Sequence, residues 1–158
     1  AIADTVLLMT YEWGYMYGPP MAVAPISQVR RVLDYAVTAI PRNKIFMGVP
    51  NYAYDWPLPY VRNQTAAETI GNETAVDIAR EYGVVISYDE TARSPYFYYR
   101  NLSGQEHVVW FEDARSIREK LLLIQEYNLK GPGYWNVMRQ FTQNWLVINS
   151  MFYILKRL

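Results

Sequence analysis

The protein has 158 residues, 51% of them hydrophobic, and its formal net charge at pH 7 is zero. This length supports one ordinary globular core, and the balanced charge gives no indication of a nucleic-acid partner. The lack of cysteine and the single histidine, His107, exclude a disulfide framework, a thiolate metal site and a multi-histidine metal site. No apolar run reaches the roughly 18 residues that span a membrane, so we expect no membrane span, metal or cofactor.

Aromatic residues make up 16% of the chain, with 15 Tyr and 5 Trp. Tyr and Trp combine a flat apolar face with a polar edge, which suits the C–H faces and hydroxyl groups of sugar rings. A tyrosine-rich core and surface would explain the same composition, so composition alone leaves both interpretations open.

A strand, a helix and a second strand are predicted first along the chain. Residues 4–11, DTVLLMTY, form an apolar run typical of a buried strand, and residues 11–25 form a loop rich in Gly and Pro. Ser27 is a candidate N-cap for a helix at 28–40, whose apolar residues share one face. Residues 44–56, KIFMGVPNYAYDW, repeat the opening pattern, which predicts a βαβ unit in a parallel sheet.

The second strand is predicted to end in an aromatic and acidic loop that carries Tyr52, Tyr54, Asp55 and Trp56. Residues 57–112 then depart from the alternation of strand and helix. They contain a short helix and three β-like runs, which we interpret as a small α+β insertion. The helix is expected at 74–82 and the runs at 84–89, 95–100 and 107–112.

The last third of the chain returns to the first pattern. Asp113 is expected to cap a helix at 114–127, and LKGPGYW at 129–135 is a third short strand that ends in an aromatic residue. An amphipathic helix at about 143–158 closes the chain.

The three parallel strands predict part of a barrel. A (β/α)8 barrel needs eight strands and roughly 250 residues, and its active site lies at the carboxyl ends of the strands. The predicted fold class is therefore α/β, the C-terminal portion of a (β/α)8 TIM barrel, with strands 6 to 8 and an α+β insertion between strands 7 and 8. The corresponding segments are 1–56 (strands 6 and 7 with the intervening helix), 57–112 (insertion) and 113–158 (helix, strand 8 and closing helix).

Several motifs in this order resemble glycoside hydrolase family 18, the chitinase-like (β/α)8 barrels. MTYEW at 9–13 resembles the sixth-strand motif of the family, 44–56 resembles the seventh strand, and GPGYW at 131–135 resembles the eighth. Many members carry an extra subdomain between strands seven and eight. The stretches YEWG, GPPMAVAPI, WFEDARSI and FTQNWLVIN resemble the bacterial branch that includes spore-cortex-lytic N-acetylglucosaminidases.

The resemblance implies a glycosidase that hydrolyses β-1,4-linked N-acetylglucosamine glycans in peptidoglycan or chitin. Family members use substrate-assisted retaining catalysis: a Glu that closes a D-x-x-D-x-D-x-E motif protonates the glycosidic oxygen, and the acetamido oxygen of the substrate attacks the anomeric carbon. This chain contains no such motif, so we expect the general acid to be missing and the chain alone not to hydrolyse glycans. The alternative is a non-catalytic carbohydrate-binding or pseudo-enzyme fragment that associates with another chain.

The resemblance also assigns roles to individual residues. Tyr11 would orient the acetamido group and stabilise the charge that develops on it. Glu12 stands where the family usually has Asp and would contact the sugar, although a rival interpretation makes it the general acid. The predicted substrate-binding residues are Met9, Glu12, Trp13, Tyr54, Trp56 and Trp135.

The expected partners follow from the same resemblance. The ligand would be an N-acetylglucosamine-containing glycan, and the parent protein would lie outside the cytoplasm, in the cell wall or spore envelope of a bacterium. A barrel cut before strand six exposes a sheet edge and apolar interior faces. We therefore expect the chain to pair with a missing N-terminal barrel half or to self-associate.

Overall fold

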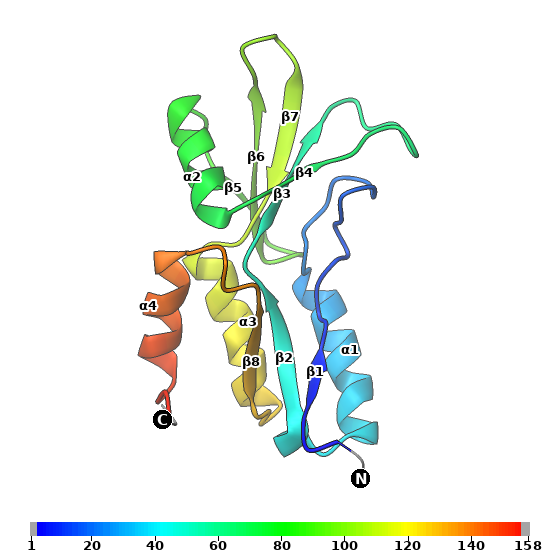
Figure 1. Ribbon diagram of the computed structural model, residues 1–158, viewed down its shortest axis with the longest axis vertical. Coiled ribbons are helices and arrows are strands. Elements are labelled where there is room, and N and C mark those ends of the chain that lie inside the picture. Colours follow the sequence, from blue (N-terminus) through cyan, green and yellow to red (C-terminus); the bar gives the residue numbers. More distant parts are fainter. Residues whose placement is uncertain (1–2, 156–158) are drawn as a thin grey trace.

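The computed structural model describes residues 3–155, which form a parallel sheet and an antiparallel sheet with four α-helices (Figure 1). The helices are α1 (Ile26–Ala39), α2 (Asn72–Glu81), α3 (Ala114–Glu126) and α4 (Thr142–Met151), with a 3-10 turn at Arg42–Lys44. The strands are β1 (Val6–Leu8), β2 (Ile45–Pro50), β3 (Ala53–Pro57), β4 (Glu68–Ile70), β5 (Ser87–Asp89), β6 (Ser94–Arg100), β7 (Glu106–Trp110) and β8 (Gly131–Trp135).

The parallel sheet has the strand order β1-β2-β8, with β2 in the centre. Leu8 pairs with Met47 and Pro50 pairs with Trp135, so the carboxyl ends of the three strands meet at one edge. In Figure 1, α1 lies beside β1 and α4 lies on the β8 side. Helices α1 and α3 share one core with β2, in which Leu33, Met47 and Leu121 are fully buried.

The antiparallel sheet has the order β4-β3-β7-β6-β5 and forms the upper part of Figure 1. Only two residues separate the end of β2 from the start of β3, so the antiparallel sheet begins almost directly where β2 ends. Helix α2 packs on one face of this sheet, where Ala75 and Ala79 join Phe97 and Val109 in a second core.

One predicted loop is wrong, because Tyr54, Asp55 and Trp56 belong to strand β3. They alternate between the two faces of the sheet and pair with β4 or β7, so their aromatic and acidic character reflects strand alternation. Strand β4 was not predicted from the sequence.

Of the two helix caps predicted from the sequence, one is confirmed and one is wrong. The Asp113 cap of α3 is confirmed, since its carboxylate accepts from the backbone N–H groups of Arg115 and Ser116 at 2.9 and 3.0 Å. The Ser27 cap is wrong: α1 begins at Ile26, whose N–H donates to the carbonyl oxygen of Ala92 at 2.9 Å. The first N–H group of the helix is therefore satisfied by a backbone carbonyl oxygen in a distant turn.

Helix α4 ends at Met151, before the predicted end of the closing helix. Phe152 has extended backbone angles, which stop the helix there. Residues 156–158, also assigned to that helix, lie outside the described residues. No helix within residues 3–155 is long and apolar enough to cross a membrane.

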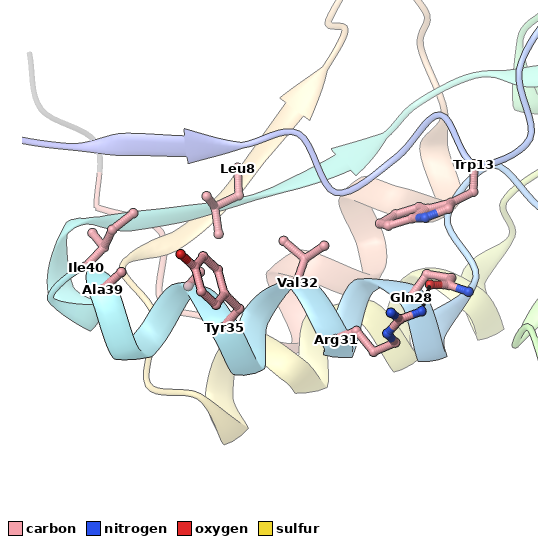
Figure 2. A pocket seen from close by; sticks show the side chains of 9 residues that line it. Leu8, Trp13, Gln28, Arg31, Val32, Tyr35, Ala39 and Ile40 are labelled. Carbon is pink, nitrogen blue, oxygen red and sulfur yellow. Dashed lines mark hydrogen bonds between the residues drawn. The ribbon is translucent and has the colours of Figure 1, made fainter.

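Both outer strands of the parallel sheet border apolar hollows. Between β1 and α1 lies a cavity of about 540 Å³ with Leu8, Val32 and Ile40 in its lining and Trp13 at one end (Figure 2). Beside β8 lies a cavity of about 640 Å³, lined in part by Phe46 and by residues after α4. The sheet is therefore open at both edges within the described part of the chain.

A buried ion pair lies where the chain leaves the antiparallel sheet for α3. The Lys120 ammonium is 2.8 Å from a Glu112 carboxylate oxygen, and both side chains are 1% exposed. The backbone N–H of Glu112 donates to the side-chain oxygen of Asn72 at 2.9 Å, which links this point to the start of α2. Burial raises the pKa of Glu112, and the Lys120 ammonium opposes that shift.

We expect Lys120→Met to destabilise the fold by about 3–5 kcal/mol, because it leaves the Glu112 carboxylate buried without a counter-charge. Urea denaturation followed by circular dichroism measures this loss. The matched control is the double variant Glu112→Leu/Lys120→Met, which removes both charges and should recover most of the stability. Equal destabilisation of the single and double variants would contradict the prediction.

Candidate functional site

A third cavity, of about 360 Å³, lies at the carboxyl ends of β1, β2 and β8. It is lined by Met9, Tyr11, Glu12, Tyr52, Tyr54, Thr69, Trp135, Asn136 and Arg139. The segments after all three parallel strands contribute side chains, and β3 and β4 of the antiparallel sheet add Tyr54 and Thr69. The site therefore depends on both sheets.

Tyr11 is held against β2 by close backbone packing. The Thr10 hydroxyl donates to the carbonyl oxygen of Gly48 at 2.7 Å. A Cβ atom on Gly48 would lie 2.7 Å from the Tyr11 ring and 2.4 Å from the Leu8 carbonyl oxygen, so a glycine is required there. Burial, and then the charge of Glu12, raise the pKa of Tyr11, and its hydroxyl stays a hydrogen-bond donor at neutral pH.

Glu12 is anchored by two phenols. Its carboxylate accepts hydrogen bonds from the Tyr52 hydroxyl and from the Tyr54 hydroxyl, the latter at 3.0 and 3.2 Å from its two oxygens. The backbone of Glu12 has φ of 72°, a left-handed conformation that costs a residue other than glycine on the order of 1–3 kcal/mol. These hydrogen bonds from Tyr52 and Tyr54 fix the position of the Glu12 carboxylate in the segment that follows β1.

The two phenols remain protonated far above neutral pH. Burial is the main cause for both, and the neighbouring Glu12 carboxylate adds to it, raising the pKa of Tyr54 to about 12 and that of Tyr52 further. Both hydroxyls therefore act as donors, and Glu12 acts as the acceptor between them.

The opposite wall of the cavity is apolar and open. Trp135 is 55% exposed and Met9 is 68% exposed, so both side chains present apolar surface to solvent. An exposed indole beside polar groups offers a flat surface on which a sugar ring can stack.

Asn51 fixes the segment that carries this wall. Its backbone N–H donates to the carbonyl oxygen of Trp135 at 2.7 Å, and its side-chain amide donates to the carbonyl oxygens of Asn136, at 3.2 Å, and Arg139. Asn51 is 1% exposed and does not line the cavity. Asn51 therefore holds the turn after β8 in place from a buried position outside the cavity.

The structure brings five of the seven predicted site residues together, namely Met9, Tyr11, Glu12, Tyr54 and Trp135. Trp13 lies instead in the cavity between β1 and α1 (Figure 2). Trp56 is fully buried, and its indole N–H donates to the carbonyl oxygen of Gly18 at 3.0 Å.

Four lining residues were not selected from the sequence: Tyr52, Thr69, Asn136 and Arg139. Tyr52 carried a signal, because it follows the second apolar strand two residues before Tyr54. Within residues 3–155 no group of three or more His, Cys, Asp or Glu side chains could hold a metal ion.

The model of the family "Glycosyl hydrolases family 18" matches residues 1–139. The chain is 49% identical over 156 residues to the cortical fragment-lytic enzyme of Bacillus subtilis (strain 168), covering 99% of this chain and 36% of that protein. The crystal structure of the spore cortex-lytic enzyme SleL of Bacillus megaterium QM B1551 superposes with a TM-score of 0.93 at 48% identity, covering 99% of this chain and 36% of that one. A chitinase of Chromobacterium violaceum ATCC 12472 is 28% identical with a TM-score of 0.84, covering 93% of this chain and 45% of that one.

These matches confirm the predicted fold class and the resemblance to the bacterial spore-cortex-lytic branch. Strands β1, β2 and β8 are strands 6 to 8 of a (β/α)8 barrel, and the antiparallel sheet is the insertion between strands 7 and 8. The chain spans about 36% of the length of its Bacillus relatives. The segment boundaries at 56 and 112 and the roles of the site residues stay predictions.

We expect the free energy of unfolding to fall as the pH rises from about 10, the ordinary tyrosine pKa, to about 12, the pKa of Tyr54 in the fold. A phenol with a raised pKa stabilises the fold below its unfolded pKa, and this contribution disappears as the pH passes the folded value. Urea denaturation at a series of pH values measures the slope, which should be shallower in Tyr54→Phe. Tyr98→Phe, at a 54% exposed position, is the control and should keep the wild-type slope. A Tyr54→Phe slope equal to that of the wild type would count against this assignment.

Proposed function

The chain belongs to glycosyl hydrolases family 18, and from this membership we propose that it forms part of a glycosidase. The substrate would be a β-1,4-linked N-acetylglucosamine glycan of peptidoglycan or chitin, cleaved by substrate-assisted retaining catalysis. The observation that carries this proposal is the cavity at the carboxyl ends of β1, β2 and β8, where Tyr11, Glu12 and Trp135 converge. This is the end of a (β/α)8 barrel at which active sites form.

Each of the three residues has a role that fits its surroundings. Tyr11 keeps its proton and would donate to the acetamido group of the sugar, which orients the nucleophilic oxygen of the substrate. Glu12 is held as an acceptor by two phenols and would contact sugar hydroxyl or acetamido groups. Trp135 would form the floor on which the sugar ring stacks.

Glu12 is a poor candidate for the general acid. Its carboxylate already accepts from the Tyr52 and Tyr54 hydroxyls, so it serves as a fixed acceptor. In this proposal the acid comes from a D-x-x-D-x-D-x-E segment, which these 158 residues do not contain. The second candidate function is a carbohydrate-binding or pseudo-enzyme role, which that missing motif favours for the chain on its own.

The activities for which the relatives are named support the choice of glycan. The Bacillus proteins are named as cortex-lytic enzymes, and the Chromobacterium protein as a chitinase. Cortex peptidoglycan and chitin share the β-1,4-linked N-acetylglucosamine unit, so the proposed substrate class covers both.

We also propose a protein partner, and the open edges of the parallel sheet support this proposal. Within residues 3–155, strand β1 pairs with β2 alone, and the lining of the cavity between β1 and α1 includes Leu8, Val32 and Ile40 (Figure 2). Parallel sheets are normally covered on both faces and extended by βα units. We propose that this edge receives such a unit, from an N-terminal barrel half or from a second copy of the chain.

We expect the purified chain to bind chitooligosaccharides without hydrolysing a chromogenic chitobioside. Trp135→Ala should weaken binding by about tenfold, because it removes the stacking surface and with it a contribution of about 1.4 kcal/mol. Isothermal titration calorimetry with chitotriose measures the affinity.

Tyr98→Ala is the matched control, because Tyr98 is an equally exposed aromatic residue on the insertion sheet, away from the cavity. It should bind as the wild type does. Equal losses in both variants would contradict the assignment of the cavity, and turnover of the chitobioside by the chain alone would contradict the proposed origin of the acid.

The open sheet edge leads to a separate expectation about assembly. Light scattering at high protein concentration should show a species larger than one chain, because an unpaired apolar edge associates in water. Val32→Glu places a charge in the β1–α1 cavity and should shift the population toward the monomer. A wild-type chain that stays monomeric at high concentration would show that the edge is not an association surface.

A further inference from the structure

The single histidine of the chain lies in a hydrogen-bonded network inside the insertion. His107 Nδ1 is 2.8 Å from one carboxylate oxygen of Asp55, and the other oxygen of Asp55 accepts from the Tyr99 hydroxyl at 2.6 Å. The side chains of His107 and Asp55 are 16% and 6% exposed. Because successive residues of a strand point to opposite faces, this network lies on the other face of β3 from Tyr54 and is separate from the cavity.

The hydrogen-bond partners define where the protons of the ring lie. Asn101 Nδ2 is 3.2 Å from His107 Nε2. The side-chain oxygen of Asn101 is identified by its donors, because it accepts from the backbone N–H groups of Ser103 and Gln105 at 3.1 and 3.0 Å. The amide nitrogen therefore faces the ring, and an amide nitrogen only donates. It follows that Nε2 is an acceptor and that Nδ1 carries the proton and donates it to Asp55, as in a neutral imidazole.

Asn101 joins the ring to the turn between β6 and β7, residues 101–105, which lies at the top of Figure 1. Its side-chain oxygen also accepts from the Ser103 hydroxyl at 2.7 Å, so three donors of the turn converge on one atom. Leu102, between these donors, is 97% exposed. The polar contacts of Asn101 thus tie a solvent-exposed turn to a half-buried histidine.

A second proton on the ring would change this arrangement at one atom. Nε2 would become a donor and face the donor amide of Asn101, so their hydrogen bond would be lost. A flip of the Asn101 amide would offer its oxygen to the ring, but it would withdraw the acceptor from the N–H groups of Ser103 and Gln105. Nδ1 would keep its proton, and its contact with Asp55 would become an ion pair.

The ring is surrounded by groups of other types. The titratable side chains on its side of the sheet are Asp55 of β3, Glu68 of β4, Tyr99 of β6 and Tyr82 at the end of α2. Arg100 and Glu106, the neighbours on the other face, pair with each other at 3.8 Å, and the charged residues of α2, namely Glu73, Asp77, Arg80 and Glu81, are exposed. Burial, and then the hydrogen bond to Asp55, raise the pKa of Tyr99, so its hydroxyl remains a donor. Histidine is the side-chain type whose ordinary titration falls between about pH 5 and 8.

We propose that His107 is a proton-sensitive switch that controls the turn between β6 and β7. In the neutral form the ring holds Asn101 and the turn is ordered. In the protonated form Nε2 releases Asn101 and the turn becomes mobile, while Nδ1 and Asp55 keep β7 tied to β3. The surface that the insertion presents around Leu102 therefore depends on pH. This inference concerns the insertion alone and goes beyond the proposed glycosidase function.

Nuclear magnetic resonance of the full 158-residue chain tests the switch, and the ring signals are assigned at once because there is one histidine. Long-range proton–nitrogen correlation spectra should show a proton on Nδ1 alone at about pH 7.5 and on both nitrogens at about pH 5. Over the same range, the order parameters of the Ser103 and Gln105 amides should fall from about 0.85 to below about 0.6. The amides of Tyr54 and Asp55 should stay rigid.

Two variants separate the ring from other sources of pH dependence. His107→Gln cannot gain a proton, so the turn should have the same order parameters at both pH values. Asn101→Asp keeps an acceptor for the turn and offers a second one to the protonated Nε2, so the turn should stay ordered in acid. Asp77→Asn, which removes a titratable group at an exposed position on α2, is the matched control and should respond as the wild type does.

Three outcomes overturn the inference. A ring that keeps Nε2 unprotonated down to about pH 5 shows that no switch operates in this range. A ring that gains the proton while the Ser103 and Gln105 amides stay rigid shows that the Asn101 contact does not control the turn. A turn that becomes equally mobile in His107→Gln or in Asn101→Asp assigns the response to another group. None of these outcomes affects the proposed function, which glycan binding tests separately.

Discussion

The register of the parallel sheet is the constraint on which the site depends. Because the three strands are parallel, the segments that follow them leave the sheet at the same edge: β2 and β8 end together at the pair Pro50 and Trp135, and β1 ends at Leu8, opposite Met47. The side chains of Tyr11 and Trp135 are far apart in the sequence and share one cavity for that reason. A slip of one residue between two strands would turn every side chain to the opposite face of the sheet. Gly48 adds to this constraint, since any side chain there would collide with the β1 backbone.

The insertion contributes to the site because β3 continues directly from β2. This continuity carries Tyr54 to Glu12, and the pairing of β3 with β4 brings in Thr69. On the other face of β3, Asp55 accepts from the Tyr99 hydroxyl at 2.6 Å and lies 2.8 Å from the His107 ring. Buried polar groups with all their partners present fix one arrangement of a sheet. Strands β6 and β7 of the insertion therefore help to fix β3, whose Tyr54 lines the cavity.

The sequence predicted the parts of this fold that depend on local pattern and on family motifs. The apolar runs, the Asp113 cap and the convergence of Tyr11 with Trp135 follow from such signals. The positions of Trp13 and Trp56 did not, because a tryptophan next to a strand end has the same local signature whether it lines a cavity or packs in a core. Asn51, Arg139 and the start of α1 at Ile26 depend on contacts with distant backbone groups, which no local pattern encodes.

The charged side chains in the core form an ion pair with each other, whereas those in the cavity do not. In the core, Glu112 and Lys120 are paired at 2.8 Å and sealed from solvent, because an unpaired ion there would be costly to desolvate. In the cavity, Glu12 is held by phenols and Arg139 by a carbonyl oxygen, so that neither charge is cancelled by the other. Keeping opposite charges apart beside solvent costs little, since water screens them until a ligand displaces it.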